Sequence, residues 1–150
     1  MVDFLPPEDL LFNRGPVGDP ATYAAEVGCE SWLCLTGPLF AAMDGGTSYD
    51  DVMAAVDGRA ANVISDPPEV LDLDLARQHV AALDELPRPT LVTCRAGPRA
   101  SAVVYMYAGL KAGAAPDDVV AAAERDGAPC ATNDELKQWI ADSMTALQDH

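Results

Sequence analysis

The chain reads Leu91-Val92-Thr93-Cys94-Arg95-Ala96-Gly97-Pro98-Arg99-Ala100-Ser101 where an apolar run passes into a short loop and then into a long helical pattern. The apolar run is typical of a buried strand. A strand followed at once by a tight turn and a helix is the repeating unit of a parallel sheet. Because the rest of the chain alternates in the same way, we predict an α/β fold: a small, mostly parallel central sheet of four to five strands flanked by helices.

The predicted elements follow this alternation along the chain. Strands are expected over residues 10–13, 31–35, 62–65 and 90–93. Helices are expected over residues 20–28, 48–57, 72–86, 99–112 and 116–125. Residues 39–46 are predicted as an irregular loop, and a last helix as starting from a capping box at Thr132-Asn133-Asp134-Glu135.

Size and charge limit the classes of function. A chain of 150 residues with 49% hydrophobic residues is large enough for one domain with a proper core, and we predict a single domain over 1–150. Its net charge of −15 repels nucleic acid and acidic membrane surfaces, so we expect neither as a partner. The same charge repels a phosphorylated substrate at long range, and an anion site must therefore depend on local donors.

The chain is expected to be cytoplasmic. It shows neither a secretory signal pattern nor a run of 18 apolar residues, and its cysteines follow no disulfide framework. The sequence leaves the oligomeric state open.

The histidines and cysteines do not form a metal motif. Only His79 and His150 are present, and the cysteines at 29, 34, 94 and 130 lack paired ligands at both ends of a defined spacing. We expect no metal and no cofactor. Cys34 is predicted to be a buried core thiol, and His79 to lie on the surface of its helix.

The loop after Cys94 has the residue types of an anion cradle. Backbone N–H groups and the positive end of the following helix attract an anion, and with adjacent arginines they favour a thiolate. We therefore predict Cys94 as a nucleophile and Arg99 as the main anion ligand. The rest of the predicted anion-binding loop is Arg95, Ala96, Gly97, Pro98, Ala100 and Ser101. Two alternatives stay open: Arg95 in a surface ion pair, and Ser101 as an ordinary first-turn hydroxyl.

The loop resembles the active-site loop of the cysteine-phosphatase superfamily. Cys94, Gly97 and Ser101 stand at the spacing of the dual-specificity pattern His-Cys-x-x-Gly-x-x-Arg-Ser, but Thr93 replaces its histidine and Ala100 its arginine. Read as Cys-x4-Arg, the loop is one residue shorter and is similar to that of rhodaneses. It also looks like the Cys-Arg-Ser-Gly-Thr-Arg-Ser loop of the bacterial beta-lactamase-hydrolase-like phosphatase-type domains, a likeness that extends over most of the chain. The resemblance implies a cysteine-phosphatase-like fold.

The resemblance also implies a general acid. Phosphatases of this superfamily carry an aspartate on a loop after the strand that precedes the long helix, and Asp66 stands at that point. The alternative is that Asp66-Pro67-Pro68 is only a turn.

Three functions follow from this site. The first is hydrolysis of phosphomonoesters through a cysteinyl-phosphate, with a small anionic or phosphorylated molecule as the substrate. The second is rhodanese-type sulfur transfer through a Cys94 persulfide. The third is a non-catalytic module that binds an anion or a partner.

Overall fold

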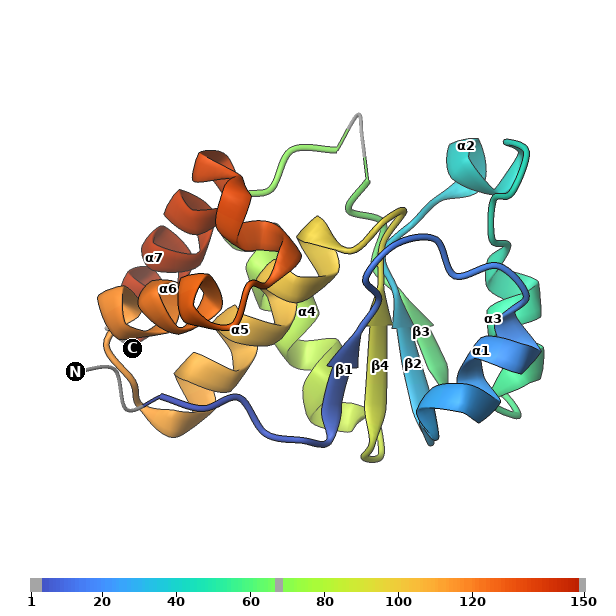
Figure 1. Ribbon diagram of the computed structural model, residues 1–150, viewed down its shortest axis with the longest axis horizontal. Helices are drawn as coiled ribbons and strands as arrows, with labels where there is room; N and C mark the ends of the chain where they lie inside the picture. The colour runs from blue at the N-terminus through green and yellow to red at the C-terminus, as the bar shows by residue number, and fades with distance from the viewer. Residues whose placement is uncertain (1–3, 67–68, 149–150) are drawn as a thin grey trace.

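The computed structural model describes residues 4–66 and 69–148, and its centre is a parallel sheet. In the described residues the sheet has four strands in the order β1-β4-β2-β3 (Figure 1). Their bounds are β1 Leu10–Phe12, β2 Ser31–Cys34, β3 Ala60–Asn62 and β4 Thr90–Thr93. All three neighbouring pairs run parallel, which confirms the predicted α/β fold with a small, mostly parallel sheet.

The strand order puts β4 in the interior of the sheet, between β1 and β2. The four residues of β4 are all buried, as the unbroken apolar run around Leu91 and Val92 predicts. Cys94 is the first residue after β4, so its loop leaves the sheet beside the loops that follow β1 and β2. Carboxyl ends of neighbouring parallel strands are the usual place for a ligand site in an open α/β sheet.

Helices cover both faces of the sheet. The α1 helix (Pro20–Val27) and the α3 helix (Tyr49–Ala55) lie on one side, and the short α2 helix (Pro38–Ala41) follows β2 (Figure 1). On the other side lie α4, α5, α6 and α7, with the 3-10 turn η1 before α7 (Figure 1). Their bounds are α4 Leu73–Glu85, α5 Pro98–Ala112, α6 Pro116–Arg125, η1 Pro129–Thr132 and α7 Asp134–Gln148.

Side chains alternate between two cores, as they must along a strand. Leu33, Val92 and Cys94 belong to the larger core under α4, α5 and α7, whereas Trp32 and Leu91 pack with the α1 and α3 side. Cys34 is 1% exposed on the smaller side, which confirms it as a buried thiol. The cysteine loop therefore opens toward α4, α5 and α7.

Most predicted helix starts are confirmed by their caps. Asp19, Ser48 and Asp72 each accept a hydrogen bond from the backbone N–H three residues later. The cap of α7 differs from the prediction: Asn133, not Thr132, accepts the N–H of Leu136, at 3.0 Å. Residues 129–132 are already wound into η1, which leaves the capping position to Asn133.

Two further predictions are wrong in detail. The third strand lies over Ala60–Asn62 rather than 62–65, and its pairing with β2 begins where Arg59 O accepts the N–H of Trp32. Beyond Asn62, the N–H groups of Val63 and Ser65 still bond to Cys34 O and Leu35 O, but outside the paired strands. The loop predicted over 39–46 begins with α2, whose first turn is preset by the fixed φ of Pro38. No helix in the described part of the chain is long and apolar enough to cross a membrane.

Candidate active site

The sulfur of Cys94 sits at the start of α5. Cys94 is 5% exposed, and its Sγ accepts the backbone N–H of Gly97 at 3.1 Å and that of Ala100 at 3.3 Å. Gly97 is the N-cap and Ala100 lies in the first turn of a 15-residue helix, whose dipole adds positive potential there. The arrangement stabilises negative charge on the sulfur. Burial raises the pKa of the Cys34 and Cys130 thiols, which do not line the pocket that contains Cys94.

Gly97 and Asn13 fix the shape of this loop. Gly97 has φ 117°, and a Cβ at this position would lie 2.2 Å from the carbonyl oxygen of Asn13. The Asn13 side chain is fully buried: its Oδ1 accepts the N–H of Cys94 at 3.2 Å, and its Nδ2 donates to the carbonyl of Cys94 at 3.0 Å. Gly15 donates its N–H to Ala96 O at 2.7 Å. The loop after β1 thus clamps the cysteine loop from the side.

Asn13 was missed in the sequence because nothing near it marks it as part of a site. The available signal is topological: Asn13 directly follows β1, and β1 pairs with β4. That neighbourhood depends on the strand order, which the sequence does not display.

Arg95 and Asp66 form a partly buried ion pair. Arg95 donates through Nε at 3.3 Å and Nη2 at 3.1 Å to Asp66 Oδ2, and its guanidinium lies 5.3 Å from the centroid of the Phe40 ring. The other Asp66 oxygen, Oδ1, accepts the N–H of Gly37 at 3.1 Å. Asp66 is only 3% exposed. The structure thus brings Asp66 to the cysteine loop, where both of its carboxylate oxygens accept hydrogen bonds. The ion pair of Arg95 is partly buried and is not a surface pair.

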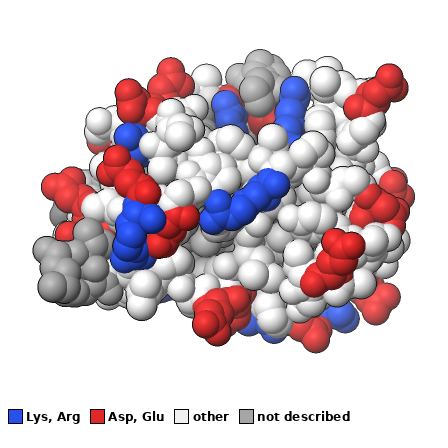
Figure 2. All heavy atoms as spheres, in the orientation of Figure 1, with Lys and Arg blue, Asp and Glu red and all other residues white. Residues whose placement is uncertain are grey.

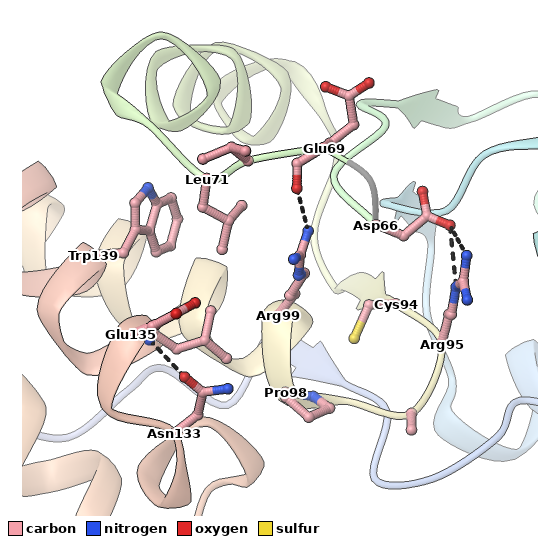
Figure 3. A pocket seen from close by; sticks show the side chains of 13 residues that line it. Asp66, Glu69, Leu71, Cys94, Arg95, Pro98, Arg99, Asn133, Glu135 and Trp139 are labelled. Atoms are coloured by element: carbon pink, nitrogen blue, oxygen red, sulfur yellow. Dashed lines mark hydrogen bonds and ion pairs between the residues drawn. The ribbon is translucent and has the colours of Figure 1, made fainter.

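Arg99 has a different environment. It lies in the first turn of α5, and its Nη1 donates to the carbonyl oxygens of Ser65 and of Glu69, the latter at 3.1 Å. Arg99 forms no ion pair with a carboxylate of residues 4–66 and 69–148. Figure 3 shows its side chain extending from the start of α5 toward Glu69, and Arg99 and Cys94 line the same pocket. Arg99 therefore adds positive charge to the pocket that contains the sulfur.

Ser101 has a structural position. Its hydroxyl donates to Pro98 O at 2.9 Å and accepts the N–H of Cys130 at 3.0 Å, which ties α5 to η1. Of the other predicted loop residues, Ala96 and Pro98 line the pocket described next, and Ala100 contributes its N–H to the sulfur.

A pocket of about 410 Å³ opens over the sulfur, a size typical of small-molecule sites. Its floor is the cysteine loop, and its walls come from the chain before α4 and from the start of α7 (Figure 3). The lining residues are Asp66, Glu69, Val70, Leu71, Cys94, Arg95, Ala96, Pro98, Arg99, Asn133, Glu135, Leu136 and Trp139. Arg14 is not one of them: it donates to Gly127 O and lies over the Phe12 ring.

His79 lies behind the pocket wall and is fully buried, so the prediction that it lies on a helix surface is wrong. The α4 helix packs against both α5 and α7, which buries a wider stripe than the apolar residues alone indicate. The imidazole meets Ser65 Oγ at 2.8 Å and the Trp139 ring edge-on, and burial lowers its pKa to about 3. His79 is thus a neutral packing residue between two parts of the pocket wall.

Comparison with known proteins gives no match to a protein-family model and none to a curated protein sequence. The chemistry of the site therefore has to be argued from its geometry. Among the described residues, no three His, Cys, Asp or Glu side chains are grouped to hold a metal ion.

Proposed function

We propose that the protein is a cysteine-dependent phosphatase that hydrolyses phosphomonoesters. One observation carries the proposal: at the floor of a pocket that Arg99 also lines, the Cys94 sulfur accepts two N–H groups from the start of α5. A nucleophile and an oxyanion-binding cation in one pocket are what phosphoryl transfer requires.

In the first step, the Cys94 thiolate attacks the phosphorus of the ester. An S–P bond forms, the P–O bond to the leaving group breaks, and the leaving oxygen takes the electron pair. Arg99 and the positive end of α5 stabilise the charge on the phosphoryl oxygens. In the second step, water attacks the cysteinyl-phosphate, which releases inorganic phosphate and restores the thiolate.

How much the reaction needs a proton donor depends on the basicity of the leaving oxygen. Asp66 is the candidate donor, and because its oxygens already accept hydrogen bonds from Gly37 and Arg95, the proton has to sit on a remaining lone pair. Aryl esters leave as stable phenoxides and need this proton least. We therefore expect aryl phosphates to be turned over faster than alkyl phosphates.

A second candidate function is sulfur transfer, which the engaged state of Asp66 favours because this reaction needs no general acid. Cys94 attacks the sulfane sulfur of thiosulfate, the S–S bond breaks, and sulfite leaves with the electron pair. The resulting persulfide then gives its outer sulfur to a thiol or to cyanide. The short spacing from Cys94 to Arg99 is the rhodanese-like feature that supports this alternative.

The test is a side-by-side assay with p-nitrophenyl phosphate and with thiosulfate plus cyanide. Mass spectrometry of the trapped protein identifies either a phosphoryl group or an extra sulfur on Cys94. C94S should abolish whichever activity is present, and R99M should lower it by about 10²–10³-fold, a typical loss for removing an oxyanion-stabilising group. C29S, which removes a cysteine outside the pocket, is the matched control.

Alkylation of Cys94 provides an independent readout. We expect iodoacetamide to modify Cys94 before the other three cysteines, for each of which burial raises the pKa. Inorganic phosphate should slow the reaction. Turnover of neither substrate, together with phosphate protection of Cys94, would instead identify a non-catalytic anion-binding module.

A further inference from the structure

The pocket has two chemically different halves. Cys94, Arg95 and Arg99 occupy the polar half at the floor, whereas Leu71 and Trp139 lie together on another side of the pocket (Figure 3). Their chain neighbours Val70 and Leu136 also line the pocket, and the four residues are called the apolar wall. An anionic group needs only the floor. The wall therefore faces whatever part of the ligand is attached to the anion.

The apolar wall is preorganised. Trp139 donates through Nε1 to Asp72 O at 3.1 Å, and its ring packs edge-on against His79 with centroids 5.8 Å apart. Leu136 lies one helical turn before it on α7 and is 5% exposed. Val70 at the rim is 75% exposed, so a bound apolar group would remove its surface from water. A rigid apolar wall binds a ligand without the loss of conformational entropy that ordering mobile side chains would cost.

Charge around the pocket limits the ligand to one anionic group. The lining carries Asp66, Glu69 and Glu135 against Arg95 and Arg99, a sum of −3 + 2 = −1. Because Asp66 pairs with Arg95, Arg99 is the lining cation left for a ligand. A second phosphate on the ligand would meet Glu135, whose carboxylate lies on the pocket side of α7 in Figure 3.

A neighbouring hollow of about 640 Å³ extends this surface along α7. It shares Val70, Leu71, Glu135 and Trp139 with the pocket over Cys94, so the two hollows meet at the apolar wall. Farther out it is lined by Asp72 and Asp142, together with Gln138. A longer ligand would again meet acidic side chains, which favours a neutral or cationic body over an anionic one.

We propose that this pocket selects a monophosphorylated molecule with an apolar body and no second acidic group. Trp139, Leu71 and Val70 hold the body, and Glu135 rejects further negative charge. This inference rests on the proposed function for the identity of the anion. The preference for one ligand over another, however, can be measured as a difference in binding affinity without any turnover.

Binding is measured by calorimetry on the C94S protein, which keeps the pocket and cannot turn the ligand over. The probes are 2-naphthyl phosphate, glycerol 3-phosphate and fructose 1,6-bisphosphate. We expect 2-naphthyl phosphate to bind about tenfold or more tightly than either of the others, because only it buries apolar surface against the wall. Equal affinities for the three probes would overturn the proposal.

Two exposed substitutions test the wall and the charge separately in the C94S background. V70S should reduce the preference for 2-naphthyl phosphate over glycerol 3-phosphate at least about twofold, and it does not threaten folding because Val70 is 75% exposed. E135K should raise the affinity ratio of fructose 1,6-bisphosphate to glycerol 3-phosphate about tenfold, since it turns a repulsive contact into an attractive one. E26K, on α1 across the sheet, is the charge-matched control and should leave this ratio unchanged.

The two proposals fail in different ways. Selective binding of 2-naphthyl phosphate to C94S without hydrolysis by the unaltered protein would overturn the phosphatase and leave the selection intact. Hydrolysis of all three probes with equal kcat/KM and equal affinity would support the phosphatase and overturn the selection.

Discussion

Gly97 shows at the scale of one residue how the site depends on a close approach of two chain segments. Its φ of 117° lies in the region that favours glycine, and the Asn13 carbonyl fills the place of a Cβ. Asn13 in turn holds both backbone polar groups of Cys94. The position of the sulfur therefore depends on the fit between Gly97 and Asn13 as well as on the N–H that Gly97 donates to it.

We predict that G97A lowers the free energy of unfolding by about 2–4 kcal/mol, because backbone strain and a collision with Asn13 O act together. G15A is the matched control, since Gly15 has φ 104° but no atom within 4 Å of an added Cβ. It should cost about 1–2 kcal/mol from strain alone. Urea denaturation measures both, and an equal loss in the two variants would contradict the close contact at Gly97.

His79 should make stability fall in acid. Burial lowers its pKa from 6.5 in the unfolded chain to about 3 in the fold, so below pH 6.5 the unfolded chain binds a proton that the fold does not. Stability from this group is complete above pH 6.5 and is lost as the pH falls toward 3. Between pH 6.5 and 5 the loss should be about 2 kcal/mol.

The H79F variant tests this, since it keeps a flat ring against Trp139 and removes the titrating group. Denaturation at pH 6.5 and at pH 5 should show a smaller loss of stability in H79F than in the unaltered protein. The same loss in both proteins would show that other groups cause the acid sensitivity.

At the scale of elements, the site forms where the four segments that follow the strands meet, at the carboxyl ends of the parallel strands. The loop after β1 supplies Asn13, the loop after β2 supplies the N–H of Gly37, the connection from β3 to α4 supplies Asp66, and β4 leads into Cys94. The Arg95–Asp66 pair joins the last two connections. A pair of this kind orients the loop. The same contact occupies one oxygen of Asp66, the carboxyl that is also the candidate proton donor.

D66N separates these two roles of Asp66. If Asp66 donates the proton, D66N should lower turnover of an alkyl phosphate by about 10²–10⁴-fold, the usual range for general acid catalysis, and lower p-nitrophenyl phosphate turnover much less. Sulfur transfer from thiosulfate should stay nearly intact. An equal loss on alkyl and aryl esters would identify Asp66 as a positioning residue that acts through Arg95. R95M, which removes the other partner of the pair, shows the size of that purely positional effect.

At the scale of the whole molecule, the surface charge opposes the approach of the anionic substrate that we propose for the site. The chain carries a net charge of −15, and Figure 2 shows acidic side chains spread around the edges of one face. A dianionic phosphate ester approaching from solution is therefore repelled until it comes within reach of Arg99 and the end of α5.

Salt should accordingly speed the reaction. Raising the ionic strength from 0.01 to 0.15 M shortens the screening length from about 30 to about 8 Å, so kcat/KM for a phosphate ester should rise several-fold. The rate of Cys94 alkylation by neutral iodoacetamide is the control and should change little. A fall in kcat/KM with added salt would mean that the approach to the site is attractive.

The linear pattern of the chain determined the interior strand and its helix, because Leu91 and Val92 between two β-branched threonines, and a long apolar segment after Pro98, have few alternative structures. It also determined most helix starts, since the caps at Asp19, Ser48 and Asp72 act within three residues. Cys94, Gly97 and Arg99 could be singled out because they lie close together in the chain, and the N–H groups that reach the sulfur come from the same short segment.

The tertiary structure alone decided what each polar side chain meets. Asn13 joined the site through the β1–β4 pairing, Asp66 and Arg95 became partners across separate connections, and His79 was buried because α4 packs against two helices. These contacts join residues far apart in the chain, and their energies depend on strand order and helix packing. A local pattern encodes neither of these, so the sequence singled out Cys94, while the Asn13 contacts that hold its backbone and the walls of its pocket were apparent only in the folded molecule.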